Sequence, residues 1–242
     1  MSIKSIVKTE NRDTTPMNEQ KARFEDFIKY YARDNGAMVS IAIGVLDYLT
    51  DKTNEAHIKV LAESSPAFYN ITIVSLWEFA VIELDKMLTK KSRVSVWKLI
   101  NYVKANRQQI FTGEFYDEIR NGNTSEIVKV TFPDFNEEIA ELENQLNEKT
   151  EIIATIKTYR NKRFAHFDKQ KIEVGISVDL LKEVWDTIMD VISRLNVLYC
   201  RKAIAANPIN YQDVKSLICN LEERKRLRKM FYARVKTSGE KQ

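Results

Sequence analysis

Apolar residues recur every three to four positions along most of this chain, which is the spacing that places them on one face of an α-helix. Few residues interrupt the pattern, since the 242 residues include only 6 Gly and 4 Pro. Strand–helix alternation, internal repeats and glycine-rich phosphate-binding loops are absent from the sequence. Together these features predict an all-α protein, built as an up-and-down bundle of long helices.

Two segments within this pattern predict long helices. The first begins at Ser64-Ser65-Pro66, a good helix start with proline in the first turn, and is apolar over most of its circumference. It is expected to be the central and most buried helix. The second runs from Asp134 to Arg160 without Gly or Pro, which predicts one long amphipathic helix. Burial of the first helix would require its acids to find partners or to face a cleft: Glu78, Glu83 and Asp85.

The composition divides the chain into three parts. Residues 1–16 are polar and mixed in charge, and they are expected to form a flexible leader. Residues 17–210 carry the helical pattern and are expected to form one helical domain, with a break near Asn35-Gly36. Residues 211–242 are expected to form a basic C-terminal helix and a frayed tail.

Composition also narrows the classes of function. Lys and Arg number 38 against 34 Asp and Glu, and the formal net charge of +4 does not by itself indicate nucleic-acid binding. With 2 Cys and 2 His, the chain is neither a disulfide scaffold nor a His-rich or four-Cys metal protein, so no cofactor or metal is expected. No apolar run approaches the roughly 18 residues of a membrane span, and the first residues lack a signal sequence. We therefore expect a cytoplasmic protein, with Cys200 and Cys219 as buried thiols, His57 at the surface, and the three Trp residues in the core.

Residues 159–168 concentrate groups that are capable of chemistry: Arg160, Asn161, Lys162, Arg163 and His166. At about 100° per residue, Arg163 and His166 lie roughly 60° apart on a helix, whereas Arg160 and His166 lie about 120° apart. A regular helix therefore does not point Arg160 and His166 at one spot. If the two act together, either the helix unwinds near Ala165 or a second subunit supplies one of them.

An arginine and a histidine without acidic metal ligands suit metal-independent cleavage of RNA. Arg160 offers a planar fork of donors that matches phosphate oxygens. His166 can move protons at neutral pH, and a cation-rich neighbourhood lowers the pKa of an imidazole and favours its basic form. In such a reaction the imidazole deprotonates the ribose 2′-OH and the guanidinium stabilises the charge on the phosphorane. The products are a 2′,3′-cyclic phosphate and a 5′-OH.

The spacing of Arg160-Asn161, four further residues and His166 resembles the signature of HEPN domains. The wider string, residues 160–168, is similar to the abortive-infection U-type branch of that superfamily, as are Leu84-Asp85-Lys86 and residues 95–100. The resemblance extends from about residue 68 to residue 199. HEPN proteins are compact all-α bundles, and many are ribonucleases of toxin–antitoxin, abortive-infection and CRISPR-linked systems.

This resemblance implies Arg160 and His166 as the catalytic pair and Asn161 as the polar residue beside the arginine. Lys162 and Arg163 follow only the local pattern of the branch and are carried as RNA-binding groups. The resemblance further implies a homodimer whose two motifs face each other across one cleft, single-stranded RNA as substrate, and an antitoxin protein as a further partner. Some HEPN domains are inactive, so the alternative is a helical module that binds RNA, a nucleotide or a protein. For the buried acids, ion pairs with the basic cluster are favoured over a role in orienting His166.

The C-terminal helix carries a second basic cluster, in which aromatic residues follow the cations. Arg224, Lys225 and Arg228 are candidates for contacts with RNA phosphates, and the aromatic residues after them for base stacking. A solvated helix face that Glu222 and Glu223 balance explains the same pattern equally well. A third interpretation is a purely structural interaction protein, which would form an interface but neither bind nor cleave RNA.

Overall fold

The computed structural model describes residues 16–110, 135–165, 176–200 and 212–239, and within these ranges the regular elements are helices. The all-α expectation is confirmed for this part of the chain. In chain order the elements are α1 (Pro16–Ala32), α2 (Asn35–Thr50), the 3-10 helix Lys52–Asn54, α3 (Glu55–Ser64), α4 (Pro66–Leu88), α5 (Val96–Ala105), α6 (Arg107–Ile110), α8 (Phe135–Glu148), α9 (Thr150–Ala165), α10 (Val178–Cys200) and α11 (Gln212–Gly239). Of the predicted leader, residues 1–16, the first 15 lie outside the described residues, and Pro16 begins α1.

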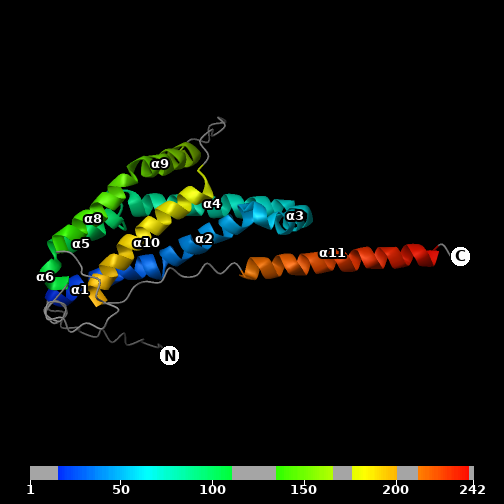
Figure 1. The fold of residues 1–242 in the computed structure, drawn as a ribbon, viewed down its shortest axis with the longest axis horizontal. Coiled ribbons are helices and arrows are strands. Elements are labelled where there is room, and N and C mark those ends of the chain that lie inside the picture. Colours follow the sequence, from blue (N-terminus) through cyan, green and yellow to red (C-terminus); the bar gives the residue numbers. More distant parts are fainter. Residues whose placement is uncertain (1–15, 111–134, 166–175, 201–211, 240–242) are drawn as a thin grey trace, which may run out of the picture.

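The core lies between α2, α4 and α10, which run side by side through the middle of the molecule (Figure 1). Leu46 of α2, Leu84 of α4 and Ile188 of α10 are fully buried there. Helices α5, α8 and α9 pack along one flank of this layer, and α1 closes it near α6. Of the tryptophans, Trp185 is buried, whereas Trp77 and Trp97 are half-buried and pack against the core.

The break between α1 and α2 falls where the sequence predicts it. Arg33 and Asp34 separate the two helices, and the amides of both donate to the carbonyl oxygen of Lys29. A side chain at Gly36 would collide with the backbone carbonyl of Tyr31, because that carbonyl occupies the position of a Cβ atom. Glycine is therefore required at this close approach of two chain segments.

Helix α4 is not the most buried helix, which corrects the expectation from its apolar circumference. Its C-terminal half is buried among α2, α9 and α10, with Ala80, Val81 and Leu84 at 0% exposure. Its N-terminal half packs only on one side, and Phe68 and Ile71 are 52% and 65% exposed. The apolar pattern does not predict burial here, because α4 is apolar on several faces. The sequence does not show which of these faces another helix covers.

The expectation that no segment is long and apolar enough for a membrane span also fails for α4. An 18-residue window of this helix has a mean hydropathy of 1.4, and 22% of the window is buried. This test rests on length and composition alone, and core helices of soluble proteins pass it as well.

The predicted single helix from residue 134 to 160 is two helices, α8 and α9, which meet at Lys149. The Thr150 hydroxyl donates to the carbonyl oxygen of Asn147 at 2.5 Å. The Lys149 amide donates to the carbonyl oxygen of Leu146, three residues back, at 3.3 Å. A threonine hydroxyl that competes for a backbone carbonyl in this way ends a regular helix without Gly or Pro. As a result α8 packs on α5 and α10, and α9 lies along α4.

Helix α11 docks on α3 through a small apolar cluster that is separate from the main core. Ile218 is fully buried there against Tyr48, Leu49 and Leu61. Beyond this cluster α11 extends past the end of α3 (Figure 1). Cys219, beside Ile218, is exposed, so its prediction as a buried thiol is wrong; the side chain of Cys200 lies outside the described residues.

His57 of α3 is half-buried, which corrects its expected surface position. Its Nδ1 lies 2.8 Å from the hydroxyl of Tyr48, and the two rings stack with centroids 6.4 Å apart. The residue thus joins α3 to the end of α2.

Candidate functional site

Arg160 lies on the last turns of α9 and forms an ion pair with Asp85 of α4. The donor is Nη1 and the acceptor is Oδ2. Packing between the two helices sets this contact, since Ile156 is fully buried and the rings of Tyr159 and Trp77 lie 6.5 Å apart. The long-range contact therefore follows from the way α9 lies on the core.

Asp85 is one of the buried acids that the sequence identified, and its side chain is 4% exposed. Besides Arg160, the Thr89 hydroxyl donates to its Oδ1 at 3.3 Å. Glu83, on another face of α4, accepts from Lys86 Nζ at 2.6 Å and from Asn35 Nδ2 at 2.9 Å. Both acids thus have the partners that their burial requires, and the predicted ion pair with the basic cluster is present at Asp85.

The guanidinium of Arg160 is held on two sides but not enclosed. Its Nε and Nη2 donate to Oδ1 of the adjacent Asn161, at 3.2 and 2.6 Å. A guanidinium has five N–H groups, so one N–H on Nη1 and one on Nη2 remain without a described acceptor. The side chain is 34% exposed. Arg160 can therefore present a pair of donors to a phosphate or carboxylate while Asp85 and Asn161 hold it in place.

The other predicted residues of this cluster are placed only in part. Asn161 and Lys162 are exposed on α9, and Arg163 belongs to the same helix, but its side chain is not described. His166 lies outside the described residues, as α9 is described only as far as Ala165. The structure thus brings Arg160 and Asn161 together.

An open apolar face lies on the N-terminal half of α4, and one of its side chains, Val74, is in line with Asp85. Val74 and Asp85 are 11 residues apart and so differ by about 20° around the helix. Val74 is 43% exposed, with Ile71 and Phe68 one and two turns further on. Tyr159 of α9 contacts Trp77, which is one turn along α4 from Val74. We refer to Phe68, Ile71 and Val74 as the α4 stripe.

The second basic cluster lies on another helix. Lys225 Nζ is 2.6 Å from Glu63 of α3, and this bond and its charge lower the pKa of the Glu63 carboxyl. Arg224 and Arg228 are exposed. Lys225 therefore helps to fix α11 on α3, and it remains exposed like the two arginines.

One basic segment, residues 86–110, was not among the predicted binding residues. Residues 86–110 hold seven cations and no acid, and the cations are Lys86, Lys90, Lys91, Arg93, Lys98, Lys104 and Arg107. These cations do not form a basic run that is visible in the sequence, since only Lys90 and Lys91 are adjacent. The useful signal was the absence of Asp and Glu. In the described part of the chain, no group of three or more His, Cys, Asp and Glu side chains is placed to hold a metal ion.

Comparison with known families gives one result for most of this chain. The family model HEPN_AbiU2, described as AbiU2, matches residues 22–217. This range includes Asp85, Arg160 and His166 and most of the described helices. Neither a curated protein nor a solved structure matches the chain significantly.

Proposed function

Because the chain belongs to the AbiU2 family of HEPN proteins, we propose that it is an endoribonuclease that cleaves single-stranded RNA without a metal ion. The observation that carries the proposal is the Arg160 guanidinium, which a buried carboxylate holds and which keeps two N–H donors for an anion. A fixed guanidinium of this kind is suited to a phosphate whose charge grows during reaction.

In the proposed reaction His166 accepts the proton of a ribose 2′-OH. The 2′ oxygen then attacks the adjacent phosphorus, and the bond from phosphorus to the 5′ oxygen breaks. The proton passes to the departing 5′ oxygen, so the products are a 2′,3′-cyclic phosphate and a 5′-OH. Arg160 donates to the non-bridging oxygens throughout, and Asn161 keeps the guanidinium oriented through its carboxamide oxygen.

The proposal includes a homodimer in which the two motifs share one cleft. The α4 stripe supports this part, because exposed large apolar side chains beside a polar site are typical of a protein interface. Trp77, one turn from Val74, contacts Tyr159, the neighbour of Arg160, so a second copy that covers the stripe would lie near the arginine. Each copy would then contribute an arginine and a histidine to a single site.

The test is to incubate the purified protein with single-stranded RNA in EDTA and to map both new ends. We expect 2′,3′-cyclic phosphate and 5′-OH ends, and loss of cleavage in Arg160→Ala and in His166→Ala. Lys59→Ala, an exposed lysine on α3, is the control and should cleave normally. Cleavage that persists in His166→Ala, or ends of another kind, would contradict the proposal.

A second candidate function is a catalytically inactive module that binds RNA, a nucleotide or a protein partner. The ion pair between Arg160 and Asp85 favours it, because such a pair also serves a purely structural purpose. The exposed Arg224 and Arg228 of α11 supply the binding surface in this case. It predicts RNA binding that weakens steeply with salt, that is lost on removal of residues 221–242, and that leads to no cleavage.

The biological setting is part of the same proposal. A metal-independent ribonuclease of this family fits phage defence or a toxin–antitoxin pair in the cytoplasm, with an antitoxin protein as the partner that restrains it. Co-purification of the chain with the product of a neighbouring gene, and suppression of RNA cleavage by that product, would test this setting.

A further inference from the structure

Two neighbouring hollows lie along α8, where it faces α5 and α6. The first, of about 380 Å³, is lined by Lys90, Trp97, Asn101, Asn144 and Asn147 together with Ala140 and Glu143. The second, of about 600 Å³, also includes Ala140 and Glu143 and is lined further by residues of α5, α6 and α8. Both volumes fall within the range of sites for small ligands. We call the two hollows together the α5–α8 groove.

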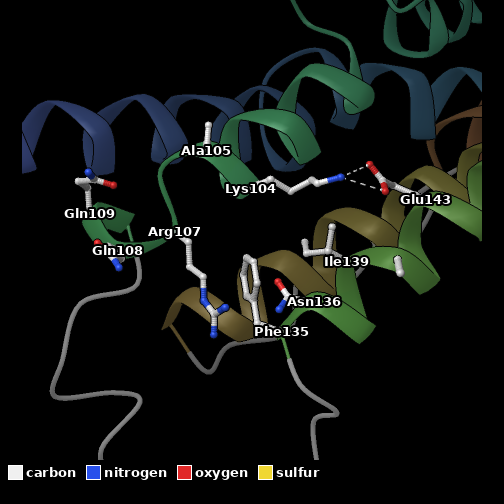
Figure 2. A pocket seen from close by; sticks show the side chains of 10 residues that line it. Lys104, Ala105, Arg107, Gln108, Gln109, Phe135, Asn136, Ile139 and Glu143 are labelled. Carbon is white, nitrogen blue, oxygen red and sulfur yellow. Dashed lines mark hydrogen bonds and ion pairs between the residues drawn. The ribbon is translucent and has the colours of Figure 1, made fainter.

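The same arrangement of side chains occurs in both hollows. In the first, Lys90 Nζ lies 4.4 Å from the centre of the Trp97 ring. In the second, the guanidinium carbon of Arg107 lies 4.2 Å from the centre of the Phe135 ring, and Figure 2 shows these two side chains beside each other. Each hollow thus pairs a cation with an aromatic ring.

Amide side chains and one ion pair complete the groove. Figure 2 shows Gln108, Gln109 and Asn136 around the second hollow. Lys104 donates to both carboxylate oxygens of Glu143, at 3.0 and 3.2 Å, where the two hollows meet. Glu143 is therefore neutralised within the groove, and it does not repel an anion as a lone carboxylate would.

The surface beside the first hollow is strongly positive. Lys90, Lys91, Arg93 and Lys98 are all exposed, and none of them forms an ion pair within the described residues. They follow Asp85, the partner of Arg160, along the chain, and Lys90 comes only five residues after it. The basic surface therefore begins just past the end of α4, which ends at Leu88, three residues after Asp85.

We propose that the α5–α8 groove binds the single-stranded RNA that extends away from the site at Arg160. This inference rests on the proposed function and names a second contact region for its substrate. The phosphates lie along Lys90, Lys91 and Lys98, and a base enters the first hollow to stack on the half-buried ring of Trp97. In the second hollow Phe135 is only 6% exposed, so a second base stacks on the Arg107 guanidinium that covers that ring. Aromatic stacking binds bases of any sequence, and Asn and Gln amides can bond to their edges.

The chemistry of the groove selects RNA over an acidic protein as the occupant. Cations alone would attract either polyanion, but a carboxylate-rich peptide has no flat rings to stack on Trp97 and on the Arg107 guanidinium. Single strands offer both a phosphate at each step and an unstacked base beside it. Two consecutive hollows that each hold a cation beside a flat group, Trp97 in the first and the Arg107 guanidinium in the second, suit a chain with a charge and a base in every unit.

The test compares two triple variants in the full chain with the same loss of charge. The groove variant loses three charges beside the first hollow, through Lys90→Gln, Lys91→Gln and Lys98→Gln. The control variant loses three charges at exposed lysines elsewhere, through Lys29→Gln, Lys52→Gln and Lys59→Gln. Binding of a fluorescein-labelled 12-nucleotide RNA is measured by anisotropy in a His166→Ala background. We expect the groove variant to bind about tenfold or more weakly, with a salt slope smaller by about 2 to 3, and the control to be unchanged. Equal affinities and equal slopes would overturn the proposal.

Base stacking has its own test. Trp97→Leu keeps an apolar side chain against the core and should weaken binding of the 12-nucleotide RNA about tenfold, but not that of an abasic strand of the same length. An equal loss on both strands would overturn the assignment of Trp97. If Trp97→Leu does not fold by circular dichroism, the lysine variants still decide the groove. Unchanged RNA binding with lost binding of a polyglutamate peptide would assign the surface to an acidic protein and overturn the proposal.

Rates of RNA cleavage test the groove separately from the proposed ribonuclease activity. With His166 restored, the groove variant should cleave a dinucleotide at the normal rate, because that substrate reaches only the site at Arg160. Its kcat/KM on the 12-nucleotide RNA should fall about tenfold with the affinity. If no variant and no parent protein cleaves either substrate, the proposed function fails, and the binding comparison still decides the groove.

Discussion

Arg160 of α9 donates from Nη1 to the buried carboxylate of Asp85 on α4, although the two residues are 75 positions apart in the chain. The contact joins the helix that carries the basic motif to the helix at the centre of the bundle. It also holds the guanidinium, which keeps one N–H on Nη1 and one on Nη2 without a described acceptor. The stability of the bundle and the geometry of the candidate site therefore share one bond.

We expect that bond to be measurable as a coupling between the two side chains. Asp85→Asn and Arg160→Gln should each lower the free energy of unfolding, with a coupling of about 1–2 kcal/mol in the double-variant cycle. The value is below that of a fully buried pair, since Arg160 is 34% exposed. Urea unfolding of the four proteins measures the coupling, and a value near zero would show that the pair contributes nothing to stability.

Asn161 and Lys162 are neighbours on α9 but should affect catalysis differently. Asn161→Ala removes the acceptor for Nε and Nη2 of Arg160, so kcat for RNA cleavage should fall about tenfold with little change in KM. Lys162→Ala removes an exposed charge and should raise KM instead. Steady-state kinetics on one RNA separates the two effects; the reverse pattern would argue against the positioning role of Asn161.

The α4 stripe should determine the oligomeric state. Ile71 is 65% exposed, so Ile71→Glu should leave the fold intact but turn a dimer into a monomer in light scattering at micromolar concentration. Leu227→Glu is the matched control, because Leu227 is 53% exposed and belongs to α11 rather than to the stripe. RNA cleavage should be lost together with the dimer. A monomeric parent protein, or a dimer that survives Ile71→Glu, would count against the shared cleft.

Tyr30 makes stability depend on alkaline pH. Burial, and then the charge of Glu83, raise the pKa of the Tyr30 hydroxyl from 10.0 to about 12. Between pH 10 and 12 the unfolded chain therefore loses this proton while the folded chain keeps it, and stability falls as pH rises. Tyr30→Phe should be less stable than the parent at pH 8, because the bond to Glu83 is lost, but should lose less stability on going to pH 11.

The urea midpoints of both proteins at pH 8 and pH 11 measure this difference. Tyr31 also has a raised pKa because of its burial, so the parent and the Tyr30→Phe variant should both lose some stability. Parallel losses in the two proteins would contradict the assignment to Tyr30.

Local signals in the sequence predicted the helix starts better than the burial of each helix. Pro66 begins α4 as predicted, and α8 begins at Phe135, directly after the predicted start at Asp134. These features depend only on residues a few positions apart. By contrast, the exposure of Phe68 depends on which helices reach that end of α4, and no local pattern contains that information.

The candidate site shows the same division. The residue types around Arg160 are visible in the sequence, and so is the need of Asp85 for a partner. That the two meet depends on how α9 crosses α4, which in turn depends on the break at Thr150. His166 falls outside the described residues, so its approach to Arg160 stays a prediction. The basic surface of residues 86–110 was missed because its cations are spaced apart and only the lack of acids marks them.

The turn at Thr150 also separates the registers of α8 and α9. In an uninterrupted helix, one residue inserted anywhere in α8 would rotate Arg160 by about 100° away from Asp85. Because a new helix begins at Thr150, the break between α8 and α9 can accommodate such an insertion. Arg160 then keeps its position opposite Asp85. The surface of α8, including its side of the α5–α8 groove, is thus free to diversify through evolution while the basic motif keeps its alignment.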